Sequence, residues 1–172
     1  AVSRNGRVAY VANLQSDDIG IYDVEADTGR LIPRTSVAAA GGRVNELRMH
    51  PTEDILYAVE KSAPHIETFE VDALTGDLTS IGTLDLGSNG GEAIVSDSLG
   101  RFLFVSNVFN DRIYTLDVDR DTFLPSLAFT SPGTGNQPLA LAITRDDRFL
   151  YTCTLGSNTI EAFTIDALTG AL

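Results

Sequence analysis

Residues 55–60, Ile-Leu-Tyr-Ala-Val-Glu, are one of four similar apolar segments spaced evenly along the chain. The matching segments lie at 8–13, 102–107 and 149–154, and each carries an aromatic side chain at the same place. Successive aromatic residues are 47 positions apart: Tyr10, Tyr57, Phe104 and Tyr151. Two further sets keep this spacing: Ile19, Ile66, Ile113 and Ile160, and Thr28, Thr75, Thr122 and Thr169. Three sets with one spacing predict a tandem structural repeat.

Each repeat consists of short apolar or β-branched runs separated by Asp, Gly, Ser, Asn and Pro, a pattern that predicts strands and not helices. The second repeat shows the runs most clearly, at 44–49, 55–60, 66–71 and 78–84. Four antiparallel strands per repeat are typical of a propeller blade. We therefore expect an all-β fold, a β-propeller segment of about four blades over 1–172. The repeats run approximately over 1–43, 44–90, 91–137 and 138–172, with the first and last incomplete.

The repeated aromatic and Ile residues are expected to pack between adjacent blades, because a position that recurs in every repeat indicates a core role. Acidic residues recur in the turns, as in Asp72–Gly76 and Asp166–Gly170. A calcium or catalytic cluster is one interpretation of these carboxylates. Turn composition favours the other, in which Asp and Thr side chains bond the turn backbone.

Composition restricts the partners. The chain has 24 Asp and Glu against 12 Lys and Arg, a net charge of −12, which disfavours nucleic acid and anionic membrane surfaces. A single cysteine, Cys153, allows no intrachain disulfide and no zinc site built on cysteines. No apolar run is long enough for a membrane helix and no leader is visible, so we expect a soluble protein. We expect neither a metal nor a cofactor. The compartment stays open, with the cytoplasm favoured over secretion.

Three stretches of the last repeat, 136–138, 142–151 and 157–172, resemble a blade of the lactonase-type seven-bladed propellers. This family includes propeller 6-phosphogluconolactonases, carboxymuconate-lactonizing enzymes and YVTN-repeat surface proteins. The resemblance implies a ring of about 330 residues, closed by further blades of a longer parent chain or by a second copy. It implies a hydrolase of a sugar lactone such as 6-phosphogluconolactone, with a lactone or sugar acid as ligand. A non-catalytic binding or surface propeller of the YVTN type is the alternative.

The innermost strand of each blade lines the propeller axis, so a site there should interrupt the apolar repeat. Strand 139–143 is expected to be a packing strand, and 92–96 is expected to be nearly one. In 45–50, by contrast, alternation places Glu46, Arg48 and His50 on one face. The guanidinium could hold a carboxylate or phosphate while His or Glu acts as the base. The alternative is a Glu46–Arg48 ion pair between blades, with His50-Pro51 as a structural turn.

Lactonase members tend to carry an Arg-His pair at the start of one inner strand, before a His-Pro turn. This chain has Asn45-Glu46 at that place, and the other two inner strands have Glu92-Ala93 and Leu139-Ala140. The resemblance therefore predicts that an Arg-His pair and its partner Glu, where present, belong to other blades. Glu60 lies one position before the acidic residue that often ends the second strand in the family. His65 is expected to be an exposed loop residue.

Overall fold

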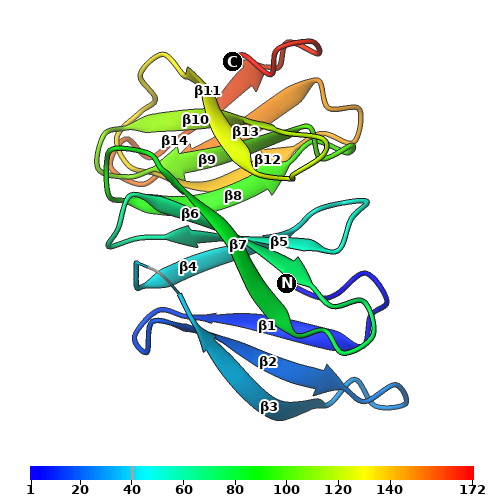
Figure 1. Cartoon of the computed structure of the whole chain (residues 1–172). Coiled ribbons are helices and arrows are strands. Elements are labelled where there is room, and N and C mark those ends of the chain that lie inside the picture. The colour runs from blue at the N-terminus through cyan, green and yellow to red at the C-terminus, as the bar shows by residue number, and fades with distance from the viewer. Residues whose placement is uncertain (40) are drawn as a thin grey trace.

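The computed structural model describes residues 1–39 and 41–172, which form four antiparallel sheets in chain order (Figure 1). The first sheet has three strands: β1 (Val8–Asn13), β2 (Asp18–Val24) and β3 (Leu31–Ala38). The second has four: β4 (Val44–Met49), β5 (Ile55–Glu60), β6 (His65–Val71) and β7 (Leu78–Asp85).

The third and fourth sheets repeat this plan. The third contains β8 (Gly91–Ser96), β9 (Phe102–Asn107), β10 (Arg112–Val118) and β11 (Pro125–Thr130). The fourth contains β12 (Pro138–Ile143), β13 (Phe149–Thr154) and β14 (Thr159–Thr164). In the second blade the strands agree with the expected ranges to within one residue at each end. The all-β fold, with blades belonging to a larger propeller, is confirmed.

The sheets stack one after another, with the inner strand β4 beside β8 and β8 beside β12 (Figure 1). The core consists of side chains held between adjacent sheets. Tyr57 and Ile66 are completely buried between the second and third blades. The Tyr57 hydroxyl also donates a hydrogen bond to the Phe123 carbonyl in the next blade, 3.0 Å away, and the Tyr10 hydroxyl donates in the same way to the Gly76 carbonyl. Apolar packing therefore stabilises these two interfaces, and a hydrogen bond from a tyrosine hydroxyl crosses each of them.

The expected burial of the repeated aromatic and Ile residues is confirmed in the first three blades and wrong in the fourth. Tyr151 is 40% exposed and Ile160 is 78% exposed, while their counterparts in the other blades are buried. The reason is geometric, because no described sheet covers this face of the β12–β14 sheet. A propeller residue of this kind is buried by the following blade as well as by its own.

The turn carboxylates have the structural role that turn composition favours. Asp72 Oδ1 accepts hydrogen bonds from the backbone N–H groups of Leu74 and Thr75, at 2.8 and 2.7 Å. These bonds lower the pKa of the Asp72 carboxyl. Within residues 1–39 and 41–172 no group of His, Cys, Asp and Glu side chains is arranged to hold a metal ion. In the same ranges, no helix has the length and apolar character needed to cross a membrane.

Candidate functional site on the inner strand of the second blade

The candidate site is built on β4, whose side chains reach across to the inner strand of the next blade. Glu46 Oε2 accepts a hydrogen bond from the backbone N–H of Ile94, 2.8 Å away. Arg48 Nε donates to Ser96 Oγ at 3.2 Å. Both contacts reach β8, and the residue two positions further along β4 contacts the residue two positions further along β8. Glu46 and Arg48 therefore point toward the same neighbour, as alternation along a strand predicts.

The Arg48 guanidinium is half-buried and is only partly used by the protein. Its Nε bonds to Ser96, whereas Nη1 and Nη2 have no hydrogen bond or ion pair to any residue in 1–39 or 41–172. Arg48 and Glu46 do not pair directly, although the arginine charge acts on the Glu46 carboxyl. Two parallel N–H donors on one guanidinium match the two oxygens of a carboxylate or phosphate. The open edge of Arg48 can therefore hold an oxyanion.

Glu46 lies beside this open guanidinium, and the pKa of its carboxyl is raised. Burial raises the pKa of its carboxyl, and the nearby Glu92 charge acts in the same direction. The Ile94 hydrogen bond and the Arg48 charge oppose that rise. A carboxylate with a raised pKa is a better proton acceptor near neutral pH than an exposed one. Chemically, the pair combines an anion-binding group with a candidate base.

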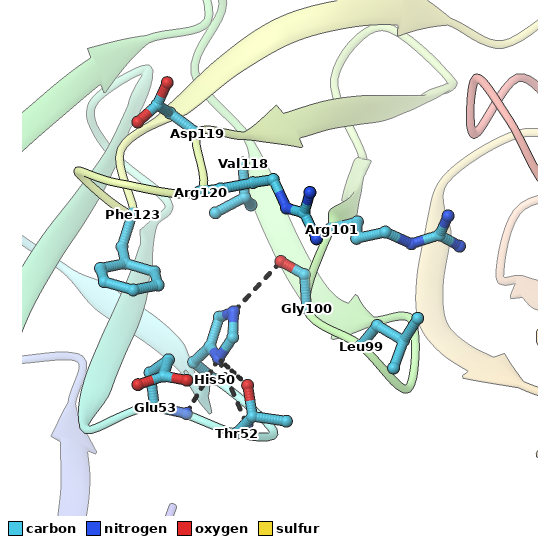
Figure 2. A pocket seen from close by; sticks show the side chains of 10 residues that line it. All are labelled: His50, Thr52, Glu53, Leu99, Gly100, Arg101, Val118, Asp119, Arg120 and Phe123. Carbon is cyan, nitrogen blue, oxygen red and sulfur yellow. Dashed lines mark hydrogen bonds between the residues drawn. The ribbon is translucent and has the colours of Figure 1, made fainter.

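His50 follows β4 and lies apart from this pair, in the turn that leads to β5. Its ring is buried, and Nδ1 accepts hydrogen bonds from the backbone N–H groups of Thr52 and Glu53, at 3.3 and 3.1 Å. Nε2 must then carry the proton, and it donates to the Gly100 carbonyl at 3.2 Å (Figure 2). Burial lowers the pKa of the ring. Both nitrogens thus hold the turn and connect it to the third blade.

Polar residues around Glu46 and Arg48 include three, Lys61, Glu92 and Ser96, that the sequence did not mark as part of a site. Lys61 Nζ forms an ion pair with Glu92 Oε2 at 2.6 Å, and Ser96 supplies the acceptor for Arg48. The expectation of a strand over 92–96 that is nearly all packing therefore fails at Glu92 and Ser96, which both have polar partners. A signal was present, because the repeat aligns Glu92 with the apolar Leu139.

A second acidic side chain is enclosed near the end of β5. Glu60 is 1% exposed, and its Oε1 accepts a hydrogen bond from the Gly41 N–H at 3.2 Å. Its Oε2 lies 3.9 Å from His65 Nδ1 and accepts no hydrogen bond from a described residue. His65 begins β6 and is half-buried, so the expectation of an exposed loop histidine is wrong. Strand pairing brings this histidine inward, against the end of the neighbouring strand.

We expect Glu60→Gln to stabilise the protein at neutral pH. Burial is the main cause that raises the pKa of the Glu60 carboxyl, so the folded state holds this proton more tightly than the unfolded chain. The associated stability is complete below the unfolded pKa of 4.5 and is lost as the pH rises through the folded pKa. Gln keeps the acceptor for Gly41 and never ionises.

Denaturant unfolding at two pH values measures this effect. Glu60→Gln should gain about 1 kcal/mol over the parent protein at pH 7 and nothing near pH 4. Glu70→Gln, on an exposed position of the neighbouring strand, is the matched control and should change little at either pH. A loss of stability at pH 7 would mean that the Glu60 charge is compensated.

Comparison with known proteins bears on this site. The family model described as "Lactonase, 7-bladed beta-propeller" matches residues 1–91 and 83–172. A 6-phosphogluconolactonase of Pectobacterium carotovorum is 28% identical over 99% of this chain, and the match covers 54% of that relative. The chain thus spans about half the length of the curated relatives it matches.

Solved structures show the same architecture. A Bacteroides uniformis protein described as a candidate 6-phosphogluconolactonase superposes with a TM-score of 0.90 at 20% identity, over 99% of this chain and 50% of that one. The periplasmic gluconolactonase of Pseudomonas aeruginosa superposes with a TM-score of 0.83, also at 20% identity, over 99% of this chain and 50% of its own. At such identities the likeness concerns the fold.

Proposed function

The chain belongs to the lactonase family of seven-bladed β-propellers. We propose that it forms part of a hydrolase of a sugar lactone such as 6-phosphogluconolactone. Relatives named 6-phosphogluconolactonase at 28% and 27% identity support this substrate class. The chain spans about half of each of them, and the proposal therefore concerns the contribution of these blades to a larger ring.

In the proposed site, Arg48 binds the phosphate or carboxylate of the sugar and Glu46 takes a proton from the attacking water. The observation that carries this assignment is the pair of open Nη groups on the half-buried Arg48, because a purely structural arginine would have its donors satisfied within the protein. The resulting hydroxide adds to the lactone carbonyl, the ring C–O bond breaks and the ring oxygen takes up the proton that Glu46 accepted. The product is the open-chain acid.

We assign His50 a positioning role in this scheme. Its two nitrogens hold the turn after β4 and the Gly100 carbonyl, so a base role would require these bonds to break. Glu46 is the better placed proton acceptor, since its hydrogen bond to Ile94 engages Oε2 alone and the Arg48 charge acts on its carboxyl. Residues 45 and 46 are Asn and Glu where lactonase members tend to have an Arg-His pair. We infer that further catalytic groups come from other blades of the ring.

The test is Arg48→Ala in the intact protein, with hydrolysis of 6-phosphogluconolactone as the readout. Loss of a charge-assisted contact should reduce kcat/KM by about tenfold or more, while the melting temperature changes only modestly. Arg145→Ala removes an equal charge from an exposed turn and should leave turnover unchanged. Unchanged turnover together with a large loss of stability in Arg48→Ala would make the residue a brace between blades.

A non-catalytic binding propeller is the second candidate, favoured by the replacement of the Arg-His pair with Asn45-Glu46. Such a protein would bind the sugar acid at Arg48 without turning over the lactone. Calorimetric titration of the intact protein with 6-phosphogluconate separates the two functions. Binding that depends on Arg48, combined with no hydrolysis, supports the binding propeller.

A further inference from the structure

The turn between the third and fourth strands of the third blade departs from the repeat at two positions. Arg120 occupies a place that is Ala in the other blades, and Phe123 occupies one that is Gly. The matching residues are Ala26, Ala73 and Ala167, and Gly29, Gly76 and Gly170. Asp119 and Thr122 keep the acidic residue and the Thr that shape this turn elsewhere, and Thr122 donates to Asp119 Oδ1 through both its N–H and its hydroxyl. The turn therefore keeps its hydrogen bonds and differs in these two side chains.

Phe123 holds a backbone conformation that an aromatic residue adopts at a cost. Its φ is 59°, in the left-handed region where the equivalent glycines have φ values of 70°, 75° and 69°. The Cβ atom makes this region unfavourable for Phe and not for Gly. The Phe123 carbonyl is fixed by the Tyr57 hydroxyl, a bond that Gly would make equally well. Beyond the turn, the ring packs against the apolar cluster between the second and third blades. Non-glycine residues held in such conformations also concentrate at functional sites.

Both altered side chains line one pocket, of about 280 Å³, between the second and third blades. It lies at the end of β4 that carries His50, away from the Lys61–Glu92 ion pair at the Val44 end. The Phe123 ring meets the His50 ring edge-on, with centroids 5.6 Å apart, and these rings form an apolar wall with Val118. Figure 2 shows Arg120 extending over the opposite side of this pocket, toward Gly100.

The charged groups around the pocket do not pair with one another, and the Arg120 guanidinium has no partner among the described residues. The Arg120 side chain is exposed and makes no hydrogen bond or ion pair with any residue of the described ranges. The neighbouring Arg101 differs, because its Nε donates to Asp97 Oδ2 at 3.1 Å and its head group points away from the pocket (Figure 2). The Asp119 carboxylate accepts hydrogen bonds from its own turn. Glu53 stands at the far side from Arg120, with the Thr52 hydroxyl beside it (Figure 2).

We propose that this pocket binds a small sugar that carries a phosphate or carboxylate group. The oxyanion would pair with the open Arg120 guanidinium, which is suited to two-oxygen anions. The sugar ring would lie against Phe123, and its hydroxyls would donate to the Glu53 carboxylate, an acceptor-only group. A concave site with an apolar wall and a few polar groups around it is the usual form of a small-molecule site. The site is separate from Arg48 and does not rest on the proposed lactone hydrolysis.

Calorimetric titration of the intact protein with glucose 6-phosphate and, separately, with glucuronate tests the proposal. At least one should bind saturably, and the tighter of the two identifies the preferred oxyanion. Arg120→Ala should weaken binding about tenfold. Phe123→Gly should weaken it as well. Both variants introduce the residue that the other three turns already use, so the turn keeps its conformation.

Matched controls distinguish binding in this pocket from binding elsewhere on the protein. Arg145→Ala removes the same charge from another exposed turn and should leave the affinity unchanged. Glucose and inorganic phosphate, each offering half of the ligand, should bind more weakly than glucose 6-phosphate. The proposal fails when neither sugar acid binds, or when the affinity is the same in Arg120→Ala. It also fails when Arg48→Ala abolishes binding and Arg120→Ala does not, since the anion then occupies the inner-strand site.

Discussion

Replacing Tyr57 by Ala is expected to lower the free energy of unfolding by about 3–5 kcal/mol. Tyr57 is completely buried in the apolar cluster between the second and third blades, in contact with residues of both sheets. Its removal leaves a cavity that flanking strands cannot close, because each strand is held in register by its own sheet. The hydroxyl bond to the Phe123 carbonyl is lost at the same time.

Chemical denaturation with matched variants measures this loss. Tyr57→Phe removes the hydroxyl alone and should cost about 1 kcal/mol, the usual net worth of one hydrogen bond. The difference between the two variants isolates the packing contribution of the ring. A loss below about 1 kcal/mol for Tyr57→Ala would contradict the assignment of this residue to the core.

Gly100→Ala is expected to destabilise the protein by about 2–5 kcal/mol, through two effects. The residue has a φ of 71°, a conformation that a Cβ atom disfavours. A Cβ at this position would also collide with the His50 ring. That ring cannot move aside freely, because it accepts the N–H groups of Thr52 and Glu53 while donating to the Gly100 carbonyl.

Gly87→Ala separates the conformational effect from the collision. Gly87 has nearly the same φ, 73°, but nothing lies near the place of an added Cβ. This variant should lose only about 1–2 kcal/mol, the cost of the backbone conformation. Equal losses in Gly87→Ala and Gly100→Ala would show that His50 yields to the methyl group and is no rigid brace. Thermal unfolding of both variants alongside the parent protein gives the comparison.

The His50 ring couples the end of β4 to the third blade. A neutral ring with both nitrogens engaged fixes the turn after the strand and joins it to that blade. Glu46 and Arg48 bond to the inner strand of the same blade. The relative position of these two blades therefore sets how the two open Nη groups of Arg48 are presented, so a change that loosens the His50 turn should also reduce the proposed oxyanion binding at Arg48.

The propeller architecture can be predicted because its signals are local and repeated. The aromatic residue of each second strand, the Ile of each third strand and the turn Thr recur at one spacing, and each copy meets a similar environment in its own sheet. The same local character makes the strand ranges of the second blade and the structural role of the turn acids predictable. Alternation along β4 also places Glu46 and Arg48 toward one neighbour.

Contacts between blades cannot be derived in this way. A repeat position predicts burial only where the next blade is present, which is why Tyr57 is enclosed and Tyr151 is 40% exposed. The sequence predicts His65 in solvent, yet pairing of β6 with β5 brings it toward Glu60. The repeat marks Glu92 as a departure from the apolar pattern, but the sequence does not identify its partner Lys61, nor Arg48 as the partner of Ser96, because each partner lies in another sheet.

The sequence alone predicts a 47-residue repeat of four-stranded blades, because hydrophobic alternation and turn chemistry act within a few residues. Only the tertiary structure shows that two Arg48 donor groups have no hydrogen bond to a described residue, whereas both His50 nitrogens are hydrogen-bonded. It alone also shows that Arg120 and Phe123 line a pocket together with His50. Those features depend on which atoms of one blade come within bonding distance of the next. That distance is set by the stacking of whole sheets, which a repeat pattern does not specify.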